Sequence, residues 1–311
     1  MKSSLVINRL AKYLVILILI ASFLLVLFWL WQRQPKITKE NSQNLTTPQT
    51  NQEEKAQEFI KNPKDNSILA SNKVNIEGQA DPDGYVAILA STDQAVVITT
   101  SDGQFSKEIE LGQGLNLVEV ISILPDFKQD KKQTLTLLVS GDKSQGAVFA
   151  GTVKSIFDTY LTITTPTGQK NLRSQKSTNI ILPPAPKDQE EATSPSGIKA
   201  IRVGDYLIAE GEISSPDEMT TTKIEVLRED KPQNNKKLMV GRILVSPRQN
   251  LFSVKDITNS EITEFALFKN TQITKVDKEA KPQDLTKDAN AIIIYHQDGD
   301  KNLVDLIYLL P

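Results

Sequence analysis

The stretch SDGQFSKEIELGQGLNLVEV (residues 101–120) decides the fold of the chain, because it holds two turns that separate short apolar segments. Gly103 permits a tight hairpin, and Phe105 just after it is expected to enter a core. The glycines in GQG (residues 112–114) turn the chain again, into an apolar run over residues 115–124. Short apolar runs between turn residues are typical of strands in an antiparallel sheet.

The same texture extends over residues 59–141. Val74 and Ile76 alternate with polar residues, the turn DPDG (residues 81–84) follows, and the apolar run YVAIL (residues 85–89) comes next. A set of about seven such strands, with turn signals every 8 to 12 residues, is the expected signature of an Ig-like sandwich. We therefore predict an Ig-like β-sandwich over residues 59–141.

The residues of this segment also resemble a family. Val74-x-Ile76-x-Gly78, then SDGQF at residues 101–105 and LGQGLNLVEV at residues 111–120, look like bacterial Ig-like modules of the glucodextranase B type, which occur beside surface glycosidases. Modules of that family are spacers or interaction domains. The resemblance therefore implies a binding or spacing role and no active site.

Ahead of the sandwich segment, an uncharged apolar stretch, YLVILILIASFLLVLFWLW, occupies residues 13–31. As a helix it would extend about 28 Å, close to the roughly 30 Å hydrocarbon core of a bilayer. Tyr13 at one end, and Trp29 and Trp31 at the other, have amphipathic rings that settle at headgroup depth. We predict a single transmembrane helix that contacts the lipid bilayer through residues 13–31, with Tyr13, Trp29 and Trp31 as membrane-interface anchors.

The flanks of the span predict its direction. Lys2, Arg9, Lys12 and the N-terminal amine precede it without an acidic residue, which favours a cytoplasmic N-terminus over residues 1–12. Residues 32–58 are polar and aperiodic, as in a flexible tether. A cleaved signal peptide is the alternative, but its apolar region is usually about 7 to 15 residues long. We expect an uncleaved signal anchor in the cell membrane, with the remaining chain outside.

Composition excludes several classes of chemistry. The chain has no cysteine, which removes thiol nucleophiles, iron–sulfur clusters, thiolate zinc sites and disulfides. His296 is the single histidine, so one chain cannot build a multi-histidine zinc site. The formal net charge is −2 with both signs interspersed, which leaves no sustained basic face for nucleic acid. We expect no cofactor, no metal and no nucleic-acid partner.

The second part of the chain contains a weak internal duplication. GTVKS (residues 151–155) returns as GRILV (residues 241–245), and each is expected to open a hairpin at its glycine. TNI (residues 178–180) likewise returns as TQI (residues 271–273). The duplication predicts two similar units in series.

The predicted units are a first repeat over residues 147–228, with a loop insertion at residues 183–196, and a second repeat over residues 238–311. A linker at residues 229–237 joins them. Each unit offers several short strands, and closure of a small barrel leaves no exposed sheet edge. We predict two small OB-like or related β-barrels.

These units resemble a bacterial domain of unknown function with the same order of a glycine-led hairpin, a Thr-x-Ile step and an acidic turn. The first repeat has the Val203-Gly204-Asp205 signature and the later Gly211, whereas the second has neither. The resemblance implies a β-barrel architecture and no particular chemistry.

Two features were weighed as catalytic sites. A histidine base needs a positioned nucleophile and a group that orients it, and the chain has no Gly-x-Ser-x-Gly motif, so His296 is interpreted as a surface histidine at a strand end. Glu190 and Glu191 lie in the predicted loop insertion, which is unsuited to the paired, fixed carboxylates of a glycosidase.

Two acidic turns were weighed as cation sites. Asp298, Asp300 and Asn302 have the spacing of the first ligands of a calcium loop, but Leu303 stands where an EF-hand needs glycine, and no glutamate takes the twelfth position. The DPDG turn at residues 81–84 is interpreted as a turn in the same way. The sequence leaves open whether Asp298, Asp300 and Asn302 bind a cation.

The sequence thus predicts a mainly β, membrane-anchored protein of the bacterial cell envelope. We expect a non-catalytic interaction or scaffold protein outside the cytoplasm, whose partner is an envelope protein or a wall glycan. The alternatives are a module that binds wall polysaccharide and an accessory domain of a surface enzyme complex.

Overall fold

The computed structural model describes residues 59–141, 146–184, 197–228, 231–276 and 278–311. The predicted anchor at residues 13–31, with Tyr13, Trp29 and Trp31, lies outside these ranges, as does the predicted tether. Within the ranges that are described, none of the helices has the length and apolar character needed to cross a membrane.

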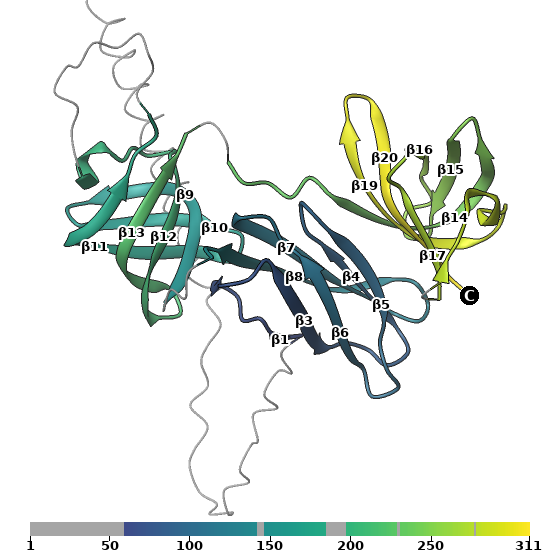
Figure 1. The fold of residues 1–311 in the computed structure, drawn as a ribbon, viewed down its shortest axis with the longest axis horizontal. Coiled ribbons are helices and arrows are strands. Elements are labelled where there is room, and N and C mark those ends of the chain that lie inside the picture. The colour runs from purple at the N-terminus through teal and green to yellow at the C-terminus, as the bar shows by residue number, and fades with distance from the viewer. Residues whose placement is uncertain (1–58, 142–145, 185–196, 229–230, 277) are drawn as a thin grey trace, which may run out of the picture. The chain divides into compact units, whose positions relative to one another are not determined.

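Two sheets enclose the first core. The smaller has the order β1-β3-β6, and the larger includes the run β2-β8-β7-β4-β5. Ile76, Phe105, Val118 and Leu137 fill the space between them, so Phe105 enters the core as the sequence predicted. The strands, in blue tones in Figure 1, are β1 (Ile60–Asn62), β2 (Ser67–Leu69), β3 (Lys73–Gln79), β4 (Tyr85–Leu89), β5 (Gln94–Ile98), β6 (Gln104–Glu110), β7 (Gly114–Ile123) and β8 (Gln129–Val139).

Five further strands form the first barrel. Each strand pairs with the next in the order β9-β10-β11-β13-β12, and β12 pairs with β9 again, so the wall closes. The pair β11–β13 is parallel and the other four pairs are antiparallel. The elements are β9 (Ala147–Phe157), β10 (Tyr160–Thr165), β11 (Gly168–Ile181), the short helix η1 (Gly197–Ala200), β12 (Tyr206–Ser215) and β13 (Glu218–Leu227).

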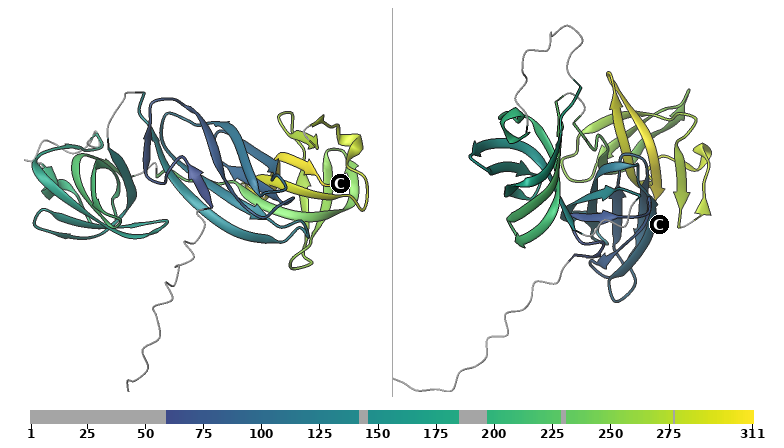
Figure 2. Two further views of the ribbon diagram at one scale, coloured as in Figure 1. Left: turned by 90° about the horizontal axis from the view of Figure 1, so that it is seen from below. Right: turned by 60° about the vertical axis from the view of Figure 1, so that its left-hand side comes forward.

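The second barrel repeats this connectivity. Its order is β15-β14-β19-β20-β16, with β16 also pairing with β15, and the parallel pair here is β16–β20. Figure 2 shows the strands of this group curving into a wall. The elements are β14 (Lys237–Arg248), β15 (Leu251–Asp256), β16 (Ile262–Ala266), β17 (Gln272–Lys275), β18 (Lys278–Glu279), the short helix η2 (Pro282–Asp284), β19 (Asn290–Asp298) and β20 (Lys301–Leu309).

The glycines that head the sequence duplication lie inside the first strand of each barrel. The prediction that they open the hairpins is wrong in this respect: β9 begins at Ala147, before Gly151. β9 pairs with β12 up to Thr152 and with β10 from Thr152 onward, so Gly151 lies next to the change of partner. Gly241 of β14 pairs with both β15 and β19. A Cβ at Gly151 would stand 2.3 Å from the carbonyl oxygen of Thr164. A Cβ at Gly241 would likewise stand 2.7 Å from the carbonyl oxygen of Lys255. Glycine is required because the second strand of each barrel approaches the first strand closely at this position.

A shared apolar core joins the sandwich to the second barrel. β4 is buried along its whole length, with Val86 and Ile88 in the sandwich core and Tyr85 and Leu89 on the opposite face. The opposite face packs with residues of β14, β19 and β20, among them Ile292. The other members of this core are Ala87, Val96, Ile121, Ile123, Val240, Ile294, Leu306, Tyr308 and Leu310.

The described residues confirm a mainly β chain that combines a β-sandwich with barrel-like sheets. A contact between Ser67 of β2 and Ala147 of β9 also links the larger sandwich sheet to the first barrel. The loop insertion predicted at residues 183–196 falls mostly outside the described ranges.

Candidate functional site

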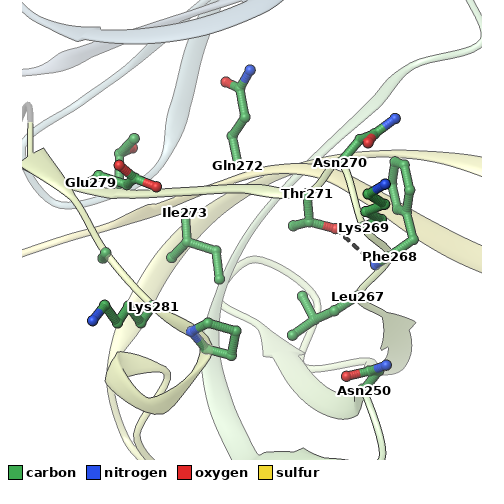
Figure 3. A pocket seen from close by; sticks show the side chains of 13 residues that line it. Asn250, Leu267, Phe268, Lys269, Asn270, Thr271, Gln272, Ile273, Glu279 and Lys281 are labelled. Carbon is green, nitrogen blue, oxygen red and sulfur yellow. Dashed lines mark hydrogen bonds between the residues drawn. The ribbon is translucent and has the colours of Figure 1, made fainter.

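A hollow in the second barrel lies at the connection from β16 to β18 and is called the connection groove. It has a volume of about 740 Å³. Figure 3 shows Phe268, Lys269 and Asn270 on one side of the groove and Glu279 and Lys281 on the other. The remaining lining residues are Asn250, Leu267, Thr271, Gln272, Ile273, Thr274, Ala280 and Pro282.

The floor of the groove is apolar and its rim is polar. Leu267 and Ile273 are buried members of the barrel core, 8% and 6% exposed. Their side chains point into the space drawn in Figure 3, while Gln272 points the other way. This alternation follows from the strand geometry of β17, because successive side chains of a strand face opposite sides.

Hydrogen bonds through Thr271 hold the turn before β17. The Phe268 N–H donates to Thr271 Oγ1 at 3.0 Å, and the Thr271 hydroxyl donates to the carbonyl oxygen of Val304 on β20 at 2.7 Å. The Thr271 N–H in turn donates to the Phe268 carbonyl at 3.1 Å. One hydroxyl therefore closes the turn and fixes it to the barrel wall.

The first barrel has the same hydrogen-bond arrangement at Thr178, which the sequence duplication matches to Thr271. The Gln175 N–H donates to Thr178 Oγ1 at 2.7 Å, and the Thr178 hydroxyl donates to the carbonyl oxygen of Thr221 on β13 at 2.8 Å. Ile180 then pairs in parallel with Ile224, as Ile273 does with Ile307 of β20. The Thr-x-Ile step is thus a structural joint in both barrels.

We expect Thr271→Val to lower the free energy of unfolding by about 1 to 2 kcal/mol, because it leaves the Phe268 N–H and the Val304 carbonyl without this partner. Thr178→Val removes the equivalent hydroxyl of the first barrel and is the variant for comparison. Denaturant titrations of both variants should give similar losses. A loss for Thr271→Val within the error of the wild type would contradict this role.

A second hollow, called the side hollow, adjoins the connection groove and has a volume of about 550 Å³. The two share three lining residues, Phe268, Asn270 and Gln272. The remaining lining residues are Ser91, Thr92, Gln94, Gln233, Asn235, Lys236, His296, Gln297 and Asp305. Segments far apart in the sequence therefore meet around one aromatic side chain.

The Phe268 ring contacts His296, which in turn contacts Asp305. The His296 ring meets the Phe268 ring edge to face, with ring centroids 6.1 Å apart and an interplanar angle of 85°. His296 Nδ1 lies 2.9 Å from Asp305 Oδ2, and the two side chains are 31% and 13% exposed. His296 lies two residues before the end of β19, near the strand end as the sequence predicted, but it is half-buried and not a free surface residue.

Lys236 brings a partly desolvated ammonium group to the side hollow. Burial lowers its pKa from 10.5, and the charges of Asp305 and Asp93 act against this by raising it. The Lys236 ammonium donates to Gln94 Oε1. Because the folded state holds this proton less firmly than the unfolded chain, Lys236 makes folding less favourable at neutral pH, and stability rises as pH approaches 10.5.

Asp305→Asn is expected to lower the pKa of Lys236 further, because it removes a negative charge that favours the ammonium form. NMR titration of the Lys236 Nζ signal measures this shift. Asp217→Asn, which removes the partner of Lys170 in the first barrel, is the control and should leave the Lys236 pKa unchanged. A rise in the Lys236 pKa on Asp305→Asn would contradict the arrangement.

The acidic turn at residues 298–302 is a hairpin turn in the structure. Asp298, Gly299, Asp300 and Lys301 make the hairpin between β19 and β20, and the Asn302 amide donates to the Glu264 carbonyl at 3.1 Å. In the described part of the chain, no group of three or more histidine, cysteine or acidic residues could hold a metal ion. Glu190 and Glu191 lie outside the described residues.

Sequence reasoning did not find the groove. Phe268, Asn270 and Gln272 follow no motif, and only the duplication signal at residues 271–273 falls within the lining. The duplication marks Thr271, whose hydrogen bonds fix the turn, but it does not indicate the groove surface around that residue.

Comparison with known proteins adds little. No protein-family model matches the chain, and no curated protein matches it. A solved structure that is similar comes from work described as structural insight into host cell surface retention of a 1.5-MDa bacterial ice-binding adhesin. The match covers 77% of this chain and 90% of that chain, at 9% identity and a TM-score of 0.18. A TM-score this low carries no argument about fold or function.

Proposed function

We propose that this protein is a membrane-anchored, non-catalytic binding protein of the bacterial cell envelope, held by residues 13–31 with its β-domains outside the cytoplasm. The apolar, uncharged span and the polar segment after it support this topology. The sandwich, in this proposal an Ig-like module of the glucodextranase B type, serves as spacer. The connection groove is the binding site.

The connectivity of the barrels supports a binding role. The order first-second-third-fifth-fourth strand, with a parallel pair between the third and fifth, is that of a five-stranded Greek-key barrel. We assign both repeats to the OB-like class on this basis. OB-folds bind oligosaccharides and oligonucleotides on their second and third strands and on the loops between strands 1 and 2 and between strands 4 and 5. The groove includes Asn250 of the loop between the first and second strands, and its other lining residues lie in the connection from the third strand to the fourth, so it adjoins that surface and does not coincide with it.

The single observation that carries the proposal is the fixed geometry of the groove. Thr271 anchors its turn to β20, and Lys281 on the opposite side begins the turn into η2, with its N–H donating to Asp284 Oδ2 at 2.8 Å. The Ala280 N–H donates to the Ile273 carbonyl at 2.8 Å and joins the two sides. A hollow with walls fixed in this way needs little ordering on binding, which favours affinity.

Crosslinking from the groove in living cells tests the proposal. The chain has no cysteine, so Lys281→Cys provides a single thiol for a photoreactive maleimide at the groove edge. Lys154→Cys on β9 of the first barrel, also exposed, is the matched control. We expect a defined adduct with an envelope component from Lys281→Cys only. Equal or absent adducts from both positions would contradict the groove as a binding site.

A further inference from the structure

We propose that the connection groove and the side hollow together bind one linear, uncharged polysaccharide chain, with Phe268 as the platform for a sugar ring. This inference rests on the proposed function and names its ligand class. The two hollows share Phe268, Asn270 and Gln272, so a ligand that fills one reaches the other along the same residues. Such an elongated site suits a polymer chain.

The hydrogen-bonding groups of the lining are mostly amides and hydroxyls. A side-chain amide offers both donors and an acceptor, and a hydroxyl does the same with one oxygen. A sugar presents neighbouring hydroxyls that also donate and accept. Uncharged polar residues of the two hollows that can serve in this way are Gln233, Asn235, Asn250, Asn270 and Gln272.

The charged residues of the lining are of both signs. In the connection groove Glu279 accompanies Lys269 and Lys281, and in the side hollow Asp305 accompanies Lys236. Asp305 also faces His296 at 2.9 Å. Nucleic acids and other polyanions require a sustained basic surface, which this lining lacks. With three lysines and two carboxylates in the lining, the surface is close to balanced, and an uncharged ligand fits it better than a polyanion.

Phe268 supplies the apolar surface that a sugar ring needs. Aromatic rings combine a large apolar face with a defined orientation. Here His296 meets the Phe268 ring edge to face, and Asp305 Oδ2 lies 2.9 Å from His296 Nδ1, so both side chains help to orient the ring. The backbone of Phe268 is fixed as well, through Thr271. The platform is therefore in place before the ligand arrives.

An extended peptide fits the site less well. Peptides commonly bind by adding a strand to an open sheet edge, through main-chain hydrogen bonds. β17 is paired with β20 along its length and with the two-residue β18 at its end, and β18 is the last strand of the sheet. The free edge at the groove is therefore only two residues long, shorter than the strands that usually pair in proteins, and the groove offers mainly side chains.

Isothermal titration calorimetry with the full chain in detergent micelles tests the inference. The probes are the β-1,4-linked hexasaccharides of glucose and of N-acetylglucosamine, their disaccharides, and a uronic acid hexasaccharide as an anionic control. We expect a neutral hexasaccharide to bind at least about tenfold more tightly than its disaccharide, because the longer chain spans both hollows. The uronic acid chain should bind more weakly than the neutral chain.

Variants locate the binding. Phe268→Ala should weaken hexasaccharide binding about tenfold or more, through loss of the platform. Gln272→Ala should weaken hexasaccharide binding severalfold. Because the Gln272 side chain is exposed, this variant should fold normally, and it tests the site even if Phe268→Ala misfolds. Phe157→Ala removes an aromatic side chain that is 82% exposed on the first barrel, and it should leave the affinity unchanged.

The two proposals fail separately. If no neutral hexasaccharide binds, or if Phe157→Ala weakens binding as much as Phe268→Ala does, the saccharide inference is overturned. If the groove thiol at position 281 still captures an envelope protein, the proposed binding function stands without the saccharide. If the thiol at position 281 captures no more than the Lys154→Cys control does, the proposed binding function is contradicted, whatever the calorimetry shows.

Discussion

Replacing Ile292 with aspartate is expected to lower the free energy of unfolding by about 4 kcal/mol or more, the largest loss that the structure predicts for a single substitution. Ile292 is fully buried in the core that joins the sandwich to the second barrel. Its neighbours across the strands are Val240 and Tyr308. A carboxylate placed there would have no cationic partner among the members of this core.

Ile262→Asp is the matched control, because it makes the same chemical change on β16 of the same barrel, where the side chain is 66% exposed. The control should change stability by about 0.5 kcal/mol or less. Far-UV circular dichroism during denaturant titration follows both variants, since the chain has two tryptophans, Trp29 and Trp31, and neither belongs to this core. Equal losses from the two variants would show that the shared core does not form.

Gly151→Ala should also destabilise the protein strongly, by about 3 kcal/mol. The added Cβ would lie 2.3 Å from the carbonyl oxygen of Thr164 and 2.8 Å from its carbonyl carbon. These are backbone atoms of β10, so no side-chain rotation relieves the clash. The barrel must open at the bend of β9 to accept the methyl group.

Gly112→Ala provides the comparison for this second substitution. A Cβ at Gly112 would stand 3.3 Å from the Thr92 methyl carbon, the nearest heavy atom outside its own neighbours, and a small side-chain shift accommodates it. Thermal unfolding of the two alanine variants should therefore differ clearly, with the lower melting temperature for Gly151→Ala. Similar melting temperatures would contradict the close approach of β10 to β9.

The strand content was predictable because its signal is local. Turn residues and alternation gave the strands of the sandwich, and the duplication located the joints at Thr178 and Thr271 in both barrels. The continuous apolar run YVAIL (residues 85–89) already indicates a strand that is buried on both faces. What covers its second face could not be predicted, because the covering residues, such as Ile292, lie some two hundred positions further along the chain.

The groove could not be predicted for a related reason. Phe268 has no sequence neighbour that marks it as a platform, and His296, which orients it, is contributed by another strand. Lys236 reaches the side hollow from the segment before β14, where Asn234 donates to the Leu89 carbonyl at 2.8 Å. Such a site arises only when the tertiary fold brings these segments together.

The central claim is that the groove faces the outside of the cell, and thiol labelling tests it most directly. Lys269→Cys places one thiol at the exposed groove rim of a chain that has no cysteine, and Ser4→Cys places one in the predicted cytoplasmic N-terminus. A membrane-impermeant maleimide is added to cells with an intact cytoplasmic membrane whose outer layers are permeable. We expect Lys269→Cys to be labelled and Ser4→Cys to react only after lysis. Labelling of Lys269→Cys only after lysis would contradict the account.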